Sequence, residues 1–560
     1  MTDILLSFSK DKVPSYEEIV SSPIMAQMTQ EYLTNIKTTD PSLALIITKT
    51  FGEKDPAKGL IGFYKRLLKE DYRAIKEEYF PFTLEKVRPL DTLDAIYDVW
   101  RKKERYAYID RGENDITSFE FLSLTDHFSE AIIMGYRTIY ENILGGEQTV
   151  YRQLPSGINA GFILNSFSDM TLPKDLSFLK ATKAIEALAI RPPFICSSKE
   201  NTRTGVFFEK DARLEKGHYN PEDFYLSCIL IKGQVGYIYV HKEYLSFLVA
   251  LGNLFEMVKP EAIKGTKPGF IVVFGADCDS DLTYYYKDEG VYVGLVPAKG
   301  HIAYFGYLKK IVLTLHNLSQ IDQGRLPIHG AGIEVTMNDG KIYNVVILGD
   351  SGAGKSETIE ALRKEGKGRV EEIKTIFDDM GTFVMRDDEV MCLGTETGAF
   401  VRLDDLDKGY SLKSVDRAIY INTEKVNSRV VIPIETYSMT KTFHRVDVFL
   451  LADNFTDDLS GLIPYPDEKV AIAEFIKGER VAKGTTSEKG KVSTFFANPF
   501  GPLQREKDCE PLIQFFFDKL YEEKVYVGRL YTRLSIDPVN GPLSGAKGLF
   551  GLLDRLEKED

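Results

Sequence analysis

The feature that most constrains this chain is a glycine-rich segment between an apolar run and a helix-forming run. Residues 345–348 have the pattern of a buried strand, and residues 355–364 have the composition of a helix that ends at Gly366. Residues 349–356 satisfy G-x-x-x-x-G-K-S in the strand-to-helix context that this pattern requires. The segment therefore predicts an α/β lobe built around a buried strand, a tight loop and a helix.

The chemistry that this loop supports is phosphate binding. Glycines let backbone N–H groups converge on phosphate oxygens, and the start of a helix adds its positive dipole end. Lys355 would reach the outer phosphates of a nucleotide, and Ser356 would hold a divalent ion. The residues expected at the phosphates are Gly349, Asp350, Ser351, Gly352, Ala353, Gly354, Lys355, Ser356 and Glu357.

Two acidic residues follow the loop at the end of another apolar run. Asp378 and Asp379 come directly after Phe377, and carboxylate oxygens suit Mg²⁺ and Mn²⁺. The pair would bind the magnesium ion of a nucleotide and a second metal ion. Upstream of the loop lie a Lys309–Lys310 pair and His329, which taken singly are typical of surface and structural residues.

Taken together and in order, these elements resemble the phosphoenolpyruvate carboxykinase superfamily, which also contains HPr kinase/phosphorylase. Residues 304–310 (YFGYLKK) are similar to the family's Tyr-Ala-Gly-Glu-Met-Lys-Lys segment, and His329, the loop and the Asp pair follow in the family's order. Residues 394–402 resemble Glu-Gly-Gly-x-Tyr-Ala-Lys, residues 427–433 resemble Asn-Thr-Arg-Val-x-Tyr-Pro, and residues 495–501 resemble Phe-Ser-x-Cys-Phe-Gly. The resemblance covers about residues 300–505.

The resemblance implies a metal centre and a role for each matching residue. Lys310, His329 and Asp379 would surround Mn²⁺, and Asp378 and Ser356 would lie near the nucleotide-bound Mg²⁺, with Ser356 counted among the metal ligands. A lysine binds metal only as the neutral amine, so the pKa of Lys310 must be lowered by burial and nearby positive charge. Phosphate would contact Arg402 and Arg429, and the acid substrate would contact Tyr304, Lys309 and Arg203.

Three functional hypotheses follow. The first is interconversion of oxaloacetate and phosphoenolpyruvate with ATP, or with GTP or pyrophosphate, as phosphoryl donor. The second is a kinase acting on a protein or small-molecule hydroxyl, because the loop sequence is closer to the HPr kinase form and the carboxykinase Gly-Arg-Ser-Pro-Lys-Asp motif is missing; Asp378 or Asp379 would then act as general base. The third is a nucleotide-binding scaffold whose first 145 residues recruit a protein partner.

The pattern of apolar residues and turn residues changes twice along the chain. Residues 1–145 carry apolar residues at helical spacing, residues 146–325 alternate short β-type runs with Gly- and Pro-rich turns, and residues 326–560 alternate strand-like and helical patterns. We therefore expect an α/β (α+β) chain with a two-lobed, carboxykinase-like fold. Its parts would be a helical N-terminal region (1–145), a substrate lobe (146–325) and a nucleotide-binding lobe (326–560).

The composition limits the classes of binding partner and the cellular compartment that we expect. Lys and Arg total 70 against 83 Asp and Glu, and the net charge of −13 disfavours nucleic acid and anionic membrane as partners. No apolar stretch is long enough to cross a bilayer, and the N-terminus lacks the pattern of a secretory signal. Five cysteines without a CxxC pair fit reduced thiols. We expect a cytoplasmic protein that binds a small dicarboxylate or phosphoenolpyruvate and a nucleotide.

Overall fold

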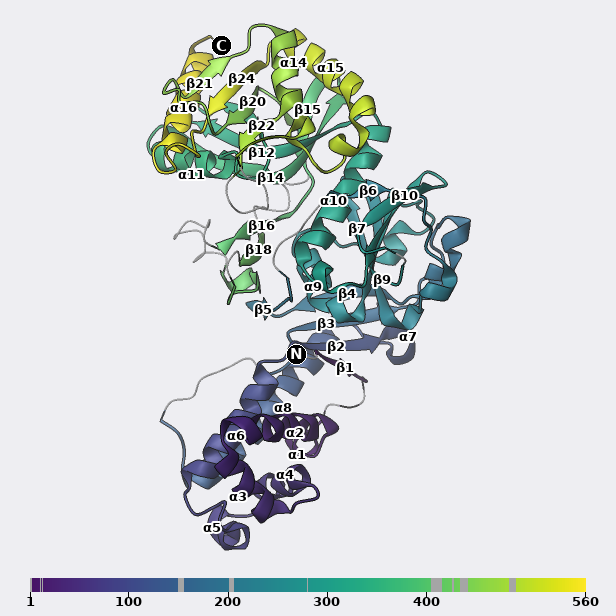
Figure 1. Cartoon of the computed structure of the whole chain (residues 1–560), viewed down its shortest axis with the longest axis vertical. Coiled ribbons are helices and arrows are strands. Elements are labelled where there is room, and N and C mark those ends of the chain that lie inside the picture. The colour runs from purple at the N-terminus through teal and green to yellow at the C-terminus, as the bar shows by residue number, and fades with distance from the viewer. Residues whose placement is uncertain are drawn as a thin grey trace. The chain divides into compact units, whose positions relative to one another are not determined.

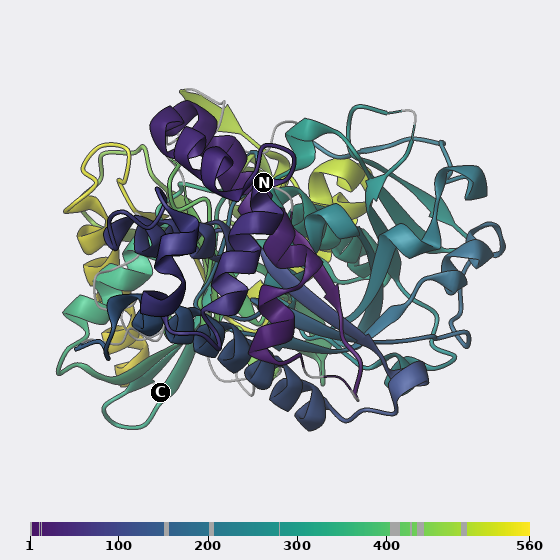
Figure 2. The same ribbon diagram turned by 90° about the horizontal axis from the view of Figure 1, so that it is seen from below.

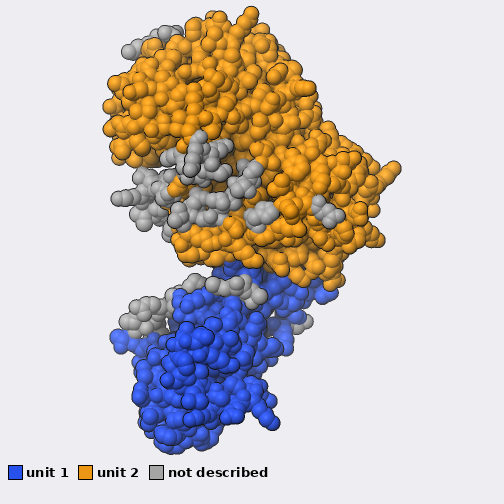
Figure 3. Space-filling model, in the orientation of Figure 1, with its two compact units in different colours: residues 1–165, 186–191 blue, residues 166–185, 192–560 orange. Residues whose placement is uncertain are grey.

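Helices and strands alternate along most of the computed structural model, which contains 42% helix and 28% strand in several mixed sheets. This confirms the α/β class expected from the sequence. The structure describes residues 3–10, 12, 14–149, 156–200, 206–278, 280–403, 415–425, 428–433, 442–482 and 490–559. The chain divides into two units, residues 1–165 with 186–191 and residues 166–185 with 192–560 (Figure 3).

Unit 1 is largely a set of helices, drawn in purple and dark blue in Figures 1 and 2. Several begin at a side-chain cap followed by proline, as at Ser22, Asp40 and Asp55, where the cap oxygen accepts a backbone N–H and proline fixes the first turn. The helices are α1 (Tyr16–Val20), α2 (Pro23–Thr39), α3 (Pro41–Phe51), α4 (Pro56–Arg66), α5 (Tyr72–Ile75), α6 (Val87–Arg101), α7 (Arg111–Asn114) and α8 (Ser118–Leu144).

Unit 1 also contains strands that the helical expectation for residues 1–145 missed. Strand β1 (Ile4–Ser7) pairs in parallel with β2 (Arg105–Asp110), which pairs in parallel with β3 (Ala160–Asn165). Strand β2 contains buried Tyr106, Ala107 and Ile109. Such short β-type runs pair across about a hundred residues of chain, and a helical periodicity in the intervening sequence gives no sign of that pairing.

The first sheet of unit 2 precedes the long helix α10 (Phe305–Asp322). It is the part of a ten-stranded sheet with the strand order β7-β8-β9-β11-β10-β6, formed by β6 (Phe208–Glu209), β7 (Phe224–Ile231), β8 (Gln234–His241), β9 (Phe270–Ala276), β10 (Tyr284–Asp288) and β11 (Val291–Pro297). Helix α10 lies so close to β11 that a Cβ at Gly294 would meet Ile311 and Leu315 at 2.9 and 2.8 Å. This close packing fixes the helix whose first turns carry Lys309 and Lys310.

A second, eight-stranded sheet holds the glycine-rich loop. Its order is β19-β15-β14-β12-β13-β20-β24-β21, with β12 (Leu326–Met337), β13 (Ile342–Leu348), β14 (Val370–Arg386), β15 (Glu389–Gly394), β19 (His444–Arg445), β20 (Val448–Asp453), β21 (Leu462–Pro464) and β24 (Tyr526–Tyr531). Side chains alternate across β13: Val345 and Ile347 pack with helices α11 (Lys355–Glu365) and α16 (Gly541–Glu559). Val346 and Leu348 pack with α14 (Glu468–Lys477) and α15 (Glu506–Glu522) (Figure 1). The sheet is thus covered on both faces, as an apolar central strand requires.

Unit 2 also contains a smaller, four-stranded sheet. Its strands are ordered β16-β18-β17-β5, with β16 (Gly398–Arg402), β18 (Arg429–Pro433), β17 (Ile419–Ile421) and β5 (Phe194–Cys196). In the described residues no helix is both long and apolar enough to cross a membrane.

Helix α10 buries a histidine that the sequence did not single out. His316 is 1% exposed, and its Nδ1 lies 2.9 Å from Oε1 of Gln234. Burial lowers the pKa of His316 to about 3, with Arg325 and Lys232 adding to the effect. The folded chain therefore keeps this ring neutral at pH values where an unfolded chain protonates it.

The neutral His316 makes stability depend on pH in a defined direction. Because the folded pKa is lowered, the contribution is complete above pH 6.5 and is lost as the pH falls toward 3. Between pH 7 and pH 5 we expect the wild-type chain to lose about 2 kcal/mol more unfolding free energy than His316→Gln. Guanidinium unfolding of both proteins at the two pH values measures this difference, and equal losses would contradict it.

Candidate active site

The glycine-rich loop runs from the end of β13 into α11 and presents free backbone amides. Among the described residues, no acceptor is hydrogen-bonded to the backbone N–H of Gly352, Gly354, Lys355 or Ser356. Lys355 folds over the same loop, with Nζ 2.6 Å from the carbonyl oxygen of Gly349, and its side chain is buried. Converging N–H groups beside an ammonium group form a site for phosphate oxygens.

Gly354 is required at its position for two separate reasons. Its φ of +91° is in the left-handed region, and a Cβ there would meet Oγ1 of Thr532 at 2.4 Å. Thr532 cannot easily move, because its hydroxyl donates to the carbonyl oxygen of Ala353 at 2.7 Å. The turn that opens α11 therefore depends on this glycine.

Gly354→Ala should destabilise the chain by about 2 to 4 kcal/mol, from backbone strain together with overpacking. Gly368→Ala is the matched control, because Gly368 has φ +84° and no atom within 4 Å of a Cβ placed there. We expect the control to cost only the strain, about 1 kcal/mol. Chemical unfolding compares the two; equal losses would show that Thr532 does not restrict the loop.

Three groups lie close to the carboxylate of Asp350, the second residue of the loop. Its Oδ1 accepts from the backbone N–H of Ser351 at 2.6 Å, and its Oδ2 accepts from Nη2 of Arg480 at 2.9 Å. Nδ1 of His329 lies 3.5 Å from Oδ1. Burial would raise the pKa of Asp350, but His329, Arg480 and the Ser351 amide outweigh it and lower the pKa. The carboxylate thus stays charged and stiffens the loop.

A second cluster centres on Asp379 in β14. Its Oδ2 accepts from Nζ of Lys309 at 2.7 Å and from Nζ of Lys310 at 2.6 Å, and its Oδ1 lies 3.0 Å from Nε2 of His329. The antiparallel register of β12 and β14 pairs His329 with Met380, which brings the ring beside Asp379. Asp379 has φ +84°, a conformation that costs energy in a non-glycine residue and is concentrated at functional sites.

The charged groups in this cluster shift one another's pKa values. Burial would raise the pKa of Asp379, but Lys309, Lys310 and His329 lower it well below its usual value. Burial would lower the pKa of Lys309, but the carboxylates of Asp379 and Glu396 raise it. For Lys310, burial prevails with the help of Lys309, and the pKa is lowered. The two adjacent lysines therefore differ, and Lys310 is the one that more readily becomes a neutral amine.

The donors around Asp379 fit a metal ion. Nδ1 of His329 lies 2.8 Å from the carbonyl oxygen of Ala497, an acceptor, so Nδ1 carries a proton. A cation that replaced the proton on Nε2 could bind this ring nitrogen and the Asp379 carboxylate together. In the described part of the chain, no three His, Cys, Asp or Glu side chains form a metal-binding group. The amine of Lys310, 2.6 Å from Oδ2 of Asp379, is a further nitrogen beside these two side chains.

Asp378 lies near both the glycine-rich loop and the lysine pair, since the charges of Lys355 and Lys309 both act on its carboxyl group. The Ser356 hydroxyl is hydrogen-bonded to its carboxyl group, so the two residues expected near Mg²⁺ are adjacent. Burial and the charge of Asp379 raise the pKa of Asp378, against the opposing effect of Lys355. A carboxyl group with a raised pKa beside a phosphate loop can bind metal or accept a proton.

The ring of Phe400, in β16, lies near two residues expected at the acid substrate, Tyr304 and Lys309, and near Arg429, which is expected at phosphate. Nζ of Lys309 lies 5.5 Å from its centroid, and the guanidinium carbon of Arg429 lies 5.6 Å from it. Tyr304, which precedes α10, has its ring 6.1 Å from the same centroid. Arg402 is the register partner of Arg429 across β16 and β18. Arg203 lies outside the described residues.

Two residues of the site were missed by sequence reasoning. Glu396 is 1% exposed, its Oε1 lies 2.8 Å from Nζ of Lys309, and burial raises the pKa of its carboxyl group to about 7. Arg480 is 4% exposed and pairs with Asp350. Glu396 lies within the 394–402 element that the family resemblance identified. Nothing in the sequence around Arg480 marks it, because its partner is 130 residues away.

Comparison with known proteins leaves the chain unassigned. No protein-family model matches it, and no curated protein sequence matches it. Function is therefore inferred from the motifs and the geometry of these side chains.

Proposed function

We propose that this protein is a phosphotransferase of the phosphoenolpyruvate carboxykinase type. It would interconvert oxaloacetate and phosphoenolpyruvate, with ATP as phosphoryl donor and Mn²⁺ and Mg²⁺ as cofactors. The observation that carries the proposal is the convergence of Lys310 and Asp379, both partly buried, on the buried His329. Asp350 links this cluster to the phosphate loop, because its carboxylate lies beside His329. A kinase without an enolate to stabilise has no need of the lysine.

The side chains divide into a donor side and an acceptor side. The amides of Gly352, Gly354 and Lys355, with the Lys355 ammonium, would hold the phosphates of the nucleotide. Ser356 and Asp378 would hold Mg²⁺, and Lys310, His329 and Asp379 would hold Mn²⁺. When bound, the metal ions supply charge neutralisation for the moving phosphoryl group and for the substrate oxygen.

On the acceptor side, Lys309 and Arg429 provide fixed positive charge around Phe400. The buried Lys309 ammonium keeps its charge through Asp379 and Glu396, and would face the carboxylate of the acid. Arg429 would donate to the transferring phosphoryl oxygens, and its Nε is buried without a partner in the described structure. Tyr304 would close the substrate pocket. No protein nucleophile is required, because the enolate oxygen of the decarboxylated acid attacks the phosphate.

The test is a donor screen with phosphoenolpyruvate as readout. The pure protein is incubated with oxaloacetate, Mn²⁺ and Mg²⁺, and with ATP, GTP or pyrophosphate, and product is followed by ³¹P NMR. We expect product with ATP and a loss of at least a hundredfold in Lys310→Met, which keeps an unbranched apolar side chain, one atom shorter, and removes the nitrogen. Absence of product with every donor would overturn the carboxykinase proposal.

One observation favours a second function, a kinase acting on a hydroxyl group. Asp378 has a raised pKa and lies beside Ser356 of the loop, which suits a general base for an attacking hydroxyl. Consumption of ATP without phosphoenolpyruvate formation, abolished by Asp378→Asn but not by Lys310→Met, would support the kinase.

A further inference from the structure

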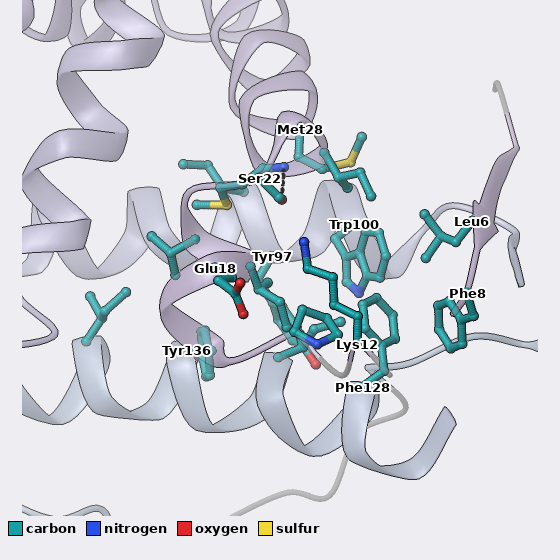
Figure 4. A pocket seen from close by; sticks show the side chains of 18 of the residues that line it. Leu6, Phe8, Lys12, Glu18, Ser22, Met28, Tyr97, Trp100, Phe128 and Tyr136 are labelled. Atoms are coloured by element: carbon teal, nitrogen blue, oxygen red, sulfur yellow. Dashed lines mark hydrogen bonds between the residues drawn. The ribbon is translucent and has the colours of Figure 1, made fainter. Parts of the chain in front are cut away.

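Unit 1 contains a partly open cavity of about 310 Å³ that the proposed phosphotransferase reaction does not use. It lies between β1, helices α1, α2 and α6, and the middle of α8. Its walls are almost entirely apolar and aromatic (Figure 4). Residues that shape it include Phe8, Met28, Tyr97, Trp100, Phe128 and Ile132.

The size and lining of the cavity define what it can hold. Its volume is at the lower end of the range for small-molecule sites, about 300 to 1,000 Å³. At roughly 30 Å³ for a water-sized group, it holds about ten such groups. Apolar cavities of this kind exclude water and take up apolar molecules. A short hydrocarbon chain therefore fits the interior.

Two charged side chains of opposite sign, Glu18 and Lys12, lie among the lining residues, and among the described residues only Glu18 makes side-chain hydrogen bonds. The carboxylate of Glu18 accepts from the backbone N–H of Ser15 at 2.9 Å and from its hydroxyl at 3.2 Å, in a capping box that starts α1. These bonds and the nearby Lys12 lower the pKa of Glu18. The carboxylate of Glu18 is thus already hydrogen-bonded at the start of α1.

The ammonium group of Lys12 has no comparable partner among the described residues. It is exposed, and among the described residues no carboxylate lies within salt-bridge distance of its ammonium group. Its side chain lines the same cavity as the rings of Tyr97, Trp100 and Phe128, all four of which are labelled in Figure 4. A lysine stem commonly covers apolar surface while its charge stays in water. The cavity thus combines an apolar interior with an exposed cation that forms no salt bridge within the described part of the chain, although its charge acts on Glu18.

We propose that this cavity binds a medium-chain amphiphilic anion, with the hydrocarbon chain inside and a carboxylate paired with Lys12. The apolar interior selects the chain, and the charge of Lys12 selects an anionic head over a neutral or cationic one. The inference is independent of the phosphotransferase site, which lies entirely in unit 2.

The chain carries its own reporter for this site, because Trp100 is its single tryptophan and lines the cavity. The full-length protein is titrated with decanoate while tryptophan emission is recorded. We expect a saturable change at micromolar to millimolar decanoate, and binding at least threefold weaker for decanol and for decyltrimethylammonium. The same emission change at equal concentrations of all three compounds would overturn the choice of an anion.

Two substitutions locate the binding. Lys12→Met keeps the apolar stem and should weaken decanoate binding by about three- to tenfold without affecting decanol. Lys37→Met is the control, because Lys37 is exposed on α2 and does not line the cavity. Ile132→Phe fills the interior and should weaken both decanoate and decanol. No saturable change in Trp100 emission, or unchanged affinity in both Lys12→Met and Ile132→Phe, would overturn the proposal.

Discussion

Lys355→Ala should reduce phosphoryl transfer by about a thousandfold or more while the chain remains folded. The Lys355 ammonium is the buried positive charge of the phosphate loop, and its Nζ contacts the loop carbonyl groups of Gly349 and Asp350. Removing it takes away charge stabilisation that grows as the phosphoryl group moves. The stability cost is about 1 to 2 kcal/mol, because only hydrogen bonds within one loop are lost.

The matched control for this substitution lies on the same helix. Lys364 is near the C-terminal end of α11, its side chain is 60% exposed, and it pairs with Glu360 at 3.6 Å. Lys364→Ala should leave the rate within twofold of wild type, because exposed pairs contribute little. Steady-state kinetics with ATP, together with thermal unfolding, separates the two variants. If Lys355→Ala retained a tenth of the activity, the loop would not be the phosphate site.

Asp379→Asn should cost both stability and activity. In the metal-free chain, the carboxylate compensates the ammonium groups of Lys309 and Lys310, whose side chains are 1% and 15% exposed. Removing one partner of a buried ion pair costs about 3 to 5 kcal/mol. Because Lys309 keeps Glu396 and Asp379 is 24% exposed, we expect about 2 to 4 kcal/mol. Activity should fall at least a hundredfold, since the proposed metal loses its charged ligand.

A control for Asp379→Asn lies at the end of β14. Asp387 is 89% exposed and lies 3.6 Å from Arg386, so Asp387→Asn should change unfolding free energy by less than about 0.5 kcal/mol. Chemical unfolding and the phosphoenolpyruvate assay are applied to both variants. If Asp379→Asn were stable but inactive, the two lysines would have other partners in the folded chain. If it were both stable and active, Asp379 would have no role in the proposed metal site.

The loop was predictable from the sequence because its determinants are local. Glycines at positive φ, a preceding buried strand and a following helix all lie within residues 342–365, and the structure places each of them there. Strand β13 was recognisable for the same reason, since its apolar residues are buried from both faces of the sheet.

The cluster around Asp379 could not be assembled from residue patterns alone. Lys310, His329 and Asp379 come from a helix and two antiparallel strands, and only the ordered resemblance to a known family linked them. Sequence patterns did not identify Glu396 and Arg480, because their partners, Lys309 and Asp350, are distant in sequence. The parallel pairing of β1 with β2 was missed for a similar reason, because a four-residue strand has little pattern of its own.

The central claim is that the lysine pair, His329, Asp379 and the glycine-rich loop form one metal-dependent phosphoryl-transfer centre. Pulsed electron paramagnetic resonance of Mn²⁺ added with ATP tests it most directly. We predict nitrogen couplings from an imidazole and an amine, and phosphorus couplings from ATP in the same complex. The imidazole coupling should be lost in His329→Phe and the phosphorus coupling in Lys355→Ala. Mn²⁺ that binds with ATP but shows no nitrogen coupling to the protein would contradict the claim.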